Sequence, residues 1–209
     1  MTIDPATALR ITKADPEFAD MVNEVLVKVN GLIHPSSTFR IVTDFTIGED
    51  CIEMEGRKLS CGKKVAMAMA GATGMVVFAM TIGDGLSELY AEYTAQMDYL
   101  SAYWCDLLAN HAVNTAMEEL KETVRAAQTD GKITSNWGPG YCGWPLTDQS
   151  ILLSLLPEED RCVSLSEAML MRPSKSLSGL IGIGKDVVYH KSGCADCFLE
   201  HCAYKNNRV

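Results

Sequence analysis

The sequence predicts an α+β fold, in which helices and strands are mixed without the regular alternation that builds a parallel sheet. Two observations predict it. Apolar residues recur at helical spacing in some segments, and in others they alternate or run continuously as in strands. The 209 residues, 47% of them apolar and 22% charged, have the composition of a globular chain and exclude a disordered one.

The first expected helix begins after Asp15-Pro16, a capping residue followed by a first-turn proline, and ends near Gly31. Its apolar face is formed by Phe18, Met21, Val22, Val25, Leu26 and Val29. From residue 38 to residue 54 the apolar spacing shortens toward two, which predicts one or two strands with a turn at Gly48-Glu49-Asp50.

Residues 65–83 carry no charge and are nominally long enough to cross a bilayer. The sequence Gly71-Ala72-Thr73-Gly74 interrupts them and indicates a turn. We therefore expect a short helix over 65–70 and a buried strand over 75–82, with a transmembrane helix as the weaker alternative.

A long helical region begins at Asp84, and a break near Asp98 divides it into two helices, the second extending to Val124. A loop is expected over 128–132. Residues 136–146 contain three glycines and two prolines, so regular structure is excluded there.

The last part of the chain is expected to contain one short helix and several strands. The helix spans 150–156, with its cap at Thr147. A strand pair is predicted over 163–171 and 176–183, and one more short strand over 187–189.

The charge and the cysteine content argue against some classes of function and of cellular compartment. The 18 basic and 27 acidic residues give a net charge of −9, which argues against nucleic-acid binding. The N-terminus shows no signal peptide, so we expect a cytoplasmic protein whose eight cysteines are thiols or metal ligands rather than disulfides.

Three cysteines lie close together near the C-terminus: Cys194, Cys197 and Cys202. A Cys-x2-Cys pair with a third thiolate predicts a metal site, either zinc or an iron–sulfur cluster. The candidates for a fourth ligand are His190, His201, Cys142 and Cys162. The alternative is a tail whose thiols bind nothing, and the other five cysteines are expected to be inert.

Gly179-x4-Gly184-Lys185 resembles a phosphate-binding loop only superficially. Asp186 follows where that loop needs Ser or Thr, and the next residues favour a strand rather than a helix. His111 is expected to be a core histidine, and no Ser-His-Asp or Cys-His set is present, so no catalytic residue is predicted.

The segment Gly138-Pro139-Gly140-Tyr141, followed by Trp144, has the composition of a ligand-binding loop. Its glycines allow close backbone approach, its proline stiffens the loop, and its aromatic rings offer flat apolar faces. Such a loop could hold a nucleoside or cover a planar macrocycle. The alternative is a structural turn whose aromatic residues only pack.

Several segments together resemble one known family. They are Ala79-Met80-Thr81-Ile82-Gly83, the two long helices, Gly138-Pro139-Gly140-Tyr141-x3-Pro145-Leu146-x2-Gln149, Leu165-Ser166-Glu167-x-Met169 and Pro173-x-Lys175-Ser176-x-Ser178-Gly179. The chain resembles the activation domain of vitamin B12-dependent methionine synthase, in a stand-alone form. The resemblance implies a single domain over 1–189, a twisted antiparallel sheet flanked by helices, followed by the cysteine-rich tail 190–209.

The resemblance also implies a function. Such a domain binds S-adenosylmethionine and docks on a corrinoid protein, whose cobalamin is reduced by an electron donor and then remethylated. The chain would be an accessory of methyl transfer, and whether it is itself an enzyme stays open. Two alternatives stay open: a corrinoid-protein partner without S-adenosylmethionine that works through the tail, and a metal-stabilised binding domain outside B12 chemistry.

Five positions would line the S-adenosylmethionine site by this resemblance: Asn136, Pro139, Gly140, Tyr141 and Tyr189. Two departures from the family pattern concern charge. Asn136 stands where the family has an arginine for the methionine carboxylate, and Asn114 stands where it has a ligand-binding glutamate. Each departure removes a charge-assisted contact at the amino-acid end of the ligand.

Overall fold

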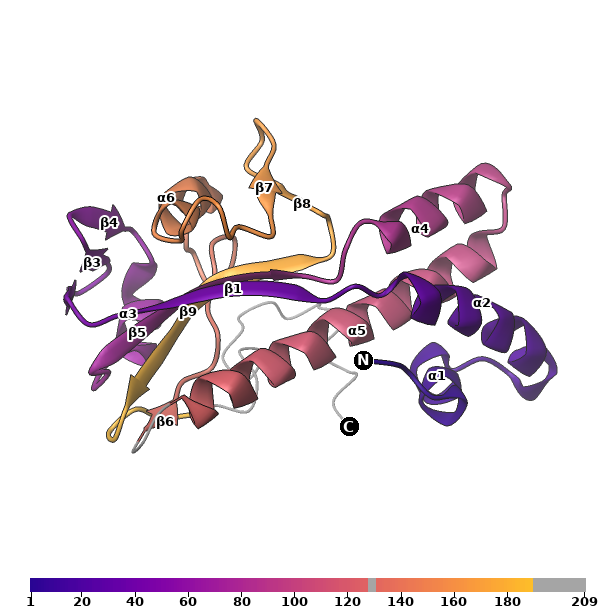
Figure 1. The fold of residues 1–209 in the computed structure, drawn as a ribbon, viewed down its shortest axis with the longest axis horizontal. Coiled ribbons are helices and arrows are strands. Elements are labelled where there is room, and N and C mark those ends of the chain that lie inside the picture. Colours follow the sequence, from indigo (N-terminus) through magenta and orange to yellow (C-terminus); the bar gives the residue numbers. More distant parts are fainter. Residues whose placement is uncertain (128–130, 190–209) are drawn as a thin grey trace. The chain divides into compact units, whose positions relative to one another are not determined.

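The computed structural model describes residues 1–127 and 131–189 (Figure 1). It confirms the α+β class. Internal packing divides the chain into two compact units. The first contains residues 1–38, 79–124 and 159–177, and the second contains 39–78, 125–158 and the described residues from 178 on. The predicted boundary between residues 189 and 190 lies at the edge of the described chain and stays a prediction.

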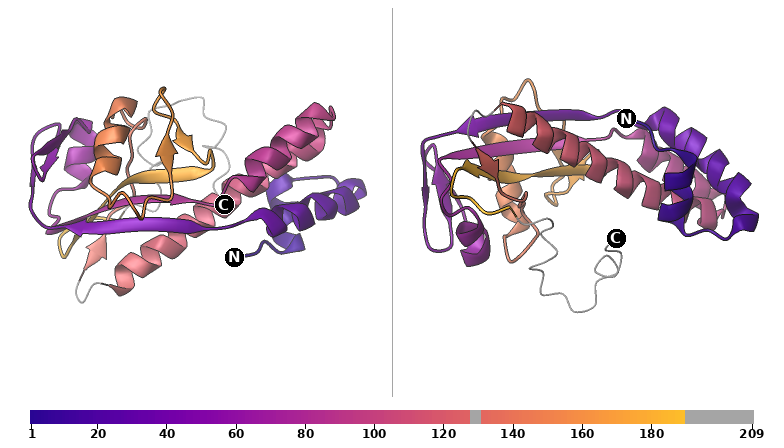
Figure 2. Two further views of the ribbon diagram at one scale, coloured as in Figure 1. Left: turned by 45° about the horizontal axis from the view of Figure 1, so that its top comes forward. Right: turned by 90° about the horizontal axis from the view of Figure 1, so that it is seen from below.

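Helices dominate the first unit and lie side by side in both views of Figure 2. They are α1 (Pro5–Thr12), the 3-10 turn η1 (Pro16–Phe18), α2 (Ala19–Leu32), α4 (Gly85–Ala95) and most of α5 (Tyr99–Ala126). Helix α1 was not predicted; its start is capped by the Asp4 side chain, which accepts a hydrogen bond from the Thr7 N–H at 2.9 Å.

The predicted division between α4 and α5 is confirmed. Met97 adopts a left-handed φ of +58° there, and the Asp98 side chain accepts a hydrogen bond from the Ser101 N–H at 3.1 Å, which caps α5. Asp15 and Asp84 stand at the predicted helix starts, but neither side chain makes a capping hydrogen bond.

Four strands form one sheet in the order β1-β5-β9-β6. Their bounds are β1 (Ser36–Val42), β5 (Gly74–Thr81), β6 (Lys132–Ile133) and β9 (Ser176–Gly184). Every residue of β5 is buried, as its continuous apolar run predicts. The uncharged stretch 65–83 therefore divides between α3 (Gly62–Ala68) and β5, and no helix in the described part of the chain could cross a membrane.

A small antiparallel sheet belongs to the second unit. It contains β2 (Phe45–Ile47), β3 (Ile52–Met54) and β4 (Arg57–Leu59). The predicted turn at residues 48–50 joins β2 to β3, and the Gly48 N–H donates to the Cys51 carbonyl at 2.9 Å.

The prediction of one strand over 163–171 is wrong. The segment is a hairpin of β7 (Ser164–Leu165) and β8 (Met171–Arg172). The Ser166 carbonyl and side chain accept hydrogen bonds from the Met169 and Leu170 N–H groups, at 3.0 and 3.2 Å, and this turn interrupts the strand.

Strand β9 does not pair with the 163–171 segment. It pairs with β6, with Ile183 opposite Ile133, so Lys132, which was expected in a loop, belongs to a strand. No strand forms over 187–189. No helix follows Gly184 among the described residues, in agreement with the rejection of a phosphate-binding loop.

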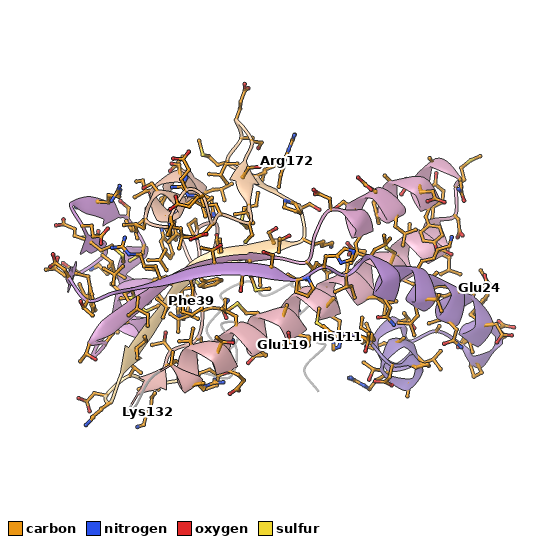
Figure 3. The ribbon with its side chains drawn as sticks, viewed as in Figure 1. Glu24, Phe39, His111, Glu119, Lys132 and Arg172 are labelled. Atoms are coloured by element: carbon orange, nitrogen blue, oxygen red, sulfur yellow. The ribbon has the colours of Figure 1, made fainter. Side chains whose placement is uncertain are left out.

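His111 lies on α5 beside α1 (Figure 3). It is half-buried rather than a full core residue. Burial, with a smaller contribution from the Arg10 charge, lowers the pKa of His111 below its usual 6.5. The folded protein therefore takes up a proton here less readily than the unfolded chain does.

The lowered pKa makes stability depend on pH. As pH falls through about 6.5, the unfolded chain binds a proton at His111 that the folded state resists, so the free energy of unfolding falls. We expect His111→Gln to reduce this dependence, measured by urea unfolding between pH 8 and pH 5. Near pH 8 the free energy of unfolding should change with pH equally in both proteins. An equal change below pH 6.5 would contradict a lowered His111 pKa.

Candidate functional site

The glycine- and proline-rich loop is anchored on β9. Trp137 and Leu180 exchange two backbone hydrogen bonds, at 3.0 and 2.7 Å. The adjacent glycines permit this approach, since a Cβ at Gly179 would lie 2.0 Å from the Trp137 carbonyl oxygen and one at Gly138 would lie 2.4 Å from that of Ser178. These two glycines therefore serve contact between backbones, whereas the loop sequence predicted approach to a ligand for Gly138.

The tip of the loop is a compact turn. The Gly140 N–H donates to the Trp144 carbonyl at 2.8 Å, and the Trp144 N–H donates to the Tyr141 carbonyl at 2.9 Å. Gly140, Cys142 and Gly143 have positive φ angles of 90°, 53° and 82°. Pro139 is buried at the base of the turn, and Tyr141 is 67% exposed at its tip. Tyr141 thus presents a free aromatic face, as predicted.

Trp144 does not present its ring as predicted, because it is buried with 2% of its surface exposed. Its indole N–H donates to Oδ2 of Asp148 at 3.0 Å, and the same oxygen accepts the Ser60 N–H at 2.6 Å. Asp148 ends the turn η2 (Leu146–Asp148) that leads into α6 (Gln149–Ser154). One buried carboxylate therefore fixes the loop to the end of β4.

The two halves of the motif that carries the resemblance meet in space. The Gln149 side-chain amide donates to the Ser178 hydroxyl, which joins the start of α6 to β9. Ser178 and Gly179 close the loop's base from the opposite side. The spacing between these segments thus reflects a physical contact.

Pro173, Lys175 and Ser176 of the same motif have a structural role in the first unit. The Lys175 ammonium contacts Asp106 at 2.5 Å and Asn110 at 2.8 Å, both on α5. The Ser176 hydroxyl donates to the Pro173 carbonyl at 2.6 Å. These contacts secure the entry to β9.

The remaining candidates are placed as follows. Asn136 is half-buried and immediately precedes the anchored Trp137. Tyr189 is 38% exposed, with the Arg125 guanidinium 5.4 Å from its ring centroid. Asn114 is exposed on α5 in the first unit. Neither Trp137 nor Arg125 could be predicted from a local pattern, because both contact partners that are distant in sequence.

The five described cysteines form no disulfide bond with one another. Burial raises the pKa of Cys61 and of Cys105 to about 11, and it also raises the pKa of Cys162, whose Sγ lies 3.4 Å from the Ala79 carbonyl oxygen. These three stay protonated near neutral pH, as inert thiols should.

In the described ranges, no three His, Cys, Asp or Glu residues gather in a way that could hold a metal ion. The predicted ligands Cys194, Cys197 and Cys202, with His190 and His201, lie outside the described residues. Zinc or an iron–sulfur cluster in the tail stays a prediction.

The anchoring glycines give a stability prediction. Gly179→Ala would force a Cβ against a backbone carbonyl 2.0 Å away, so we expect a loss of more than about 3 kcal/mol in urea unfolding. The matched control is Gly31→Ala, since a Cβ there meets nothing within 4 Å. Alanine in that helical position should raise stability by up to about 1 kcal/mol. A fully stable Gly179→Ala variant would contradict the close contact.

A second stability prediction concerns the Asp148 carboxylate. Asp148→Ala leaves the buried Trp144 indole N–H and the partly buried Ser60 N–H without an acceptor, and it should lower the free energy of unfolding by about 2 to 3 kcal/mol. Asp148→Asn keeps one neutral acceptor oxygen and should cost clearly less. Chemical unfolding followed by tryptophan fluorescence measures both, and equal losses for the two variants would contradict the acceptor role.

Comparison with known proteins finds one matching family and several similar solved structures. The family described as "Vitamin B12 dependent methionine synthase, activation domain" matches residues 55–197. Among solved structures, the MetH reactivation domain bound to AdoHcy is similar with a TM-score of 0.60 and 19% sequence identity, covering 88% of this chain and 68% of that chain. No curated protein sequence matches. Because the family match spans most of the chain, this protein belongs to the family of activation domains of vitamin B12-dependent methionine synthase.

Proposed function

We propose that this chain supports the reductive reactivation of a B12-binding protein such as methionine synthase, with S-adenosylmethionine as the source of the methyl group. The observation that carries the proposal is the 136–141 loop, which is fixed to β9 at its base and exposes Tyr141 at its tip. Family membership and the similarity to a reactivation domain bound to AdoHcy support it.

The described residues fit a ligand with a flat, uncharged part. Tyr141 offers an exposed ring for stacking, and the buried Trp137 indole N–H has no acceptor among residues 1–127 and 131–189. No residue from 136 to 144 carries a charge, so the loop itself has no ion pair to offer the amino-acid end of the ligand. Asn136 provides a neutral amide where an arginine would provide charge.

In this proposal the protein acts by positioning. Bound S-adenosylmethionine supplies a methyl group on a sulfonium, and transfer depends on holding that carbon in line with its acceptor. The anchored loop base limits movement of the ligand, and the exposed Tyr141 lies where a planar partner group can contact it. Cobalamin is carried by the partner protein, and the electron donor is a further partner.

The chain is proposed to act as a separate accessory that docks on a corrinoid protein. The second candidate is a corrinoid-protein partner that no longer binds S-adenosylmethionine and works through the cysteine tail. The observation favouring this second candidate is the neutral loop, with asparagine at both Asn136 and Asn114.

Ligand binding separates the two candidates. Calorimetry with S-adenosylmethionine and AdoHcy should show saturable binding to the wild type. Tyr141→Ala should weaken it about tenfold, because stacking of a base on an aromatic ring is worth roughly 1–3 kcal/mol.

Tyr103→Ala is the control, since Tyr103 is also an exposed tyrosine at 56% but lies on α5. Its affinity should equal that of the wild type. No heat at millimolar ligand would reject the first candidate in favour of the second. An unchanged affinity in Tyr141→Ala would remove Tyr141 from the site.

A further inference from the structure

Two buried tryptophans, one in the 136–141 loop and one just after it, differ in whether the indole N–H has a hydrogen-bond acceptor. Trp144 is 2% exposed and Trp137 is 4% exposed. The Trp144 N–H donates to Asp148 at 3.0 Å, whereas the Trp137 N–H has no hydrogen-bond acceptor in the part of the chain that the structure describes. The same chemical group is therefore satisfied at one position and unsatisfied at the other, seven residues away.

An unsatisfied buried donor needs a physical explanation. Nearly all buried polar groups in folded proteins have a partner, and a missing partner is usually a water, an ion or a ligand. An indole nitrogen only donates, so the missing group is an acceptor. Both backbone hydrogen-bonding groups of Trp137 are engaged with Leu180, which fixes the residue in place.

The electrostatics of the loop indicate which kind of acceptor suits this donor. A carboxylate brought to a buried site needs a cation to offset its lost hydration, and residues 136–144 contain none. A neutral ring nitrogen or hydroxyl oxygen carries no such cost. The acceptor that fits is therefore in the nucleoside part of a ligand and not in its amino-acid part.

We propose that the Trp137 indole N–H donates a hydrogen bond to the adenosine part of the ligand held by the 136–141 loop, an inference that rests on the proposed function. The nitrogen has no contact with solvent in this structure, so binding requires a local shift of the groups that cover it. Trp137 is thus a binding residue that recognises a neutral acceptor.

Indole NMR tests this directly. The chain has three tryptophans, so a protein labelled with 15N-tryptophan gives three indole N–H signals. They are assigned with Trp104→Phe, Trp137→Phe and Trp144→Phe. AdoHcy should move the Trp137 proton signal downfield, as a new hydrogen bond requires, and by more than it moves the other two. Methylthioadenosine, which lacks the amino-acid end, should cause the same shift, and homocysteine should not.

Affinity gives an independent measurement. Trp137→Phe should weaken AdoHcy binding about tenfold, equivalent to about 1.4 kcal/mol. Trp104→Phe is the matched control, because Trp104 is 3% exposed on α5 and packs against Phe18. Its affinity should equal the wild type's. If Trp137→Phe does not fold, the wild-type spectrum decides, with its signal assigned from the other two variants.

The outcomes separate this inference from the proposed function. If calorimetry shows AdoHcy binding but the Trp137 signal does not move, the inference is overturned and the proposed function stands. A shift with homocysteine and none with methylthioadenosine would overturn the adenosine assignment. If no ligand binds to the wild type, the proposed function fails and the inference fails with it.

Discussion

The close contact between the backbone of Trp137-Gly138 and the backbone of Ser178-Gly179 is the constraint on which the candidate site depends. Two hydrogen bonds join the segments, and no side chain fits between them. Without this contact, the turn would keep its own hydrogen bonds but would lose its attachment to β9. With it, the turn that carries Tyr141 starts from a fixed point on a strand.

The buried polar groups behind the loop complete its support. Asp148 accepts two donors from segments 84 residues apart in sequence, Ser60 and Trp144. Gln149, the next residue, holds β9 through Ser178. A site built in this way is rigid at its base and exposed at its tip, which is the usual arrangement of a binding loop on a scaffold. The groups that such a loop would offer a ligand are aromatic rings and neutral donors.

The sequence predicted the parts of the fold that have strong local patterns. Strand β5 and the helices α4 and α5 follow from apolar periodicity, and the exposed Tyr141 follows from the composition of its loop. The helix α1 was missed because it is short, and the strand prediction over 163–171 failed because the Ser166 side chain forms a turn. The Trp144 indole finds its acceptor four residues on, at Asp148, whereas Trp137 is held by Leu180, far away in sequence, so no local pattern could predict the surroundings of Trp137.

The contact between the loop and β9 also bears on how the chain can change length. One residue inserted next to Gly138 or Gly179 would place a side chain where only a hydrogen atom fits, against a carbonyl of the facing segment. In the turn between Gly140 and Gly143 the limit is different, since a Cβ at Gly143 would have nothing within 4 Å and only the positive φ angle of 82° disfavours a side chain there. Relatives of this chain can therefore differ in the length of the turn that carries Tyr141. The pairing of Trp137-Gly138 with Ser178-Gly179 has to stay unchanged.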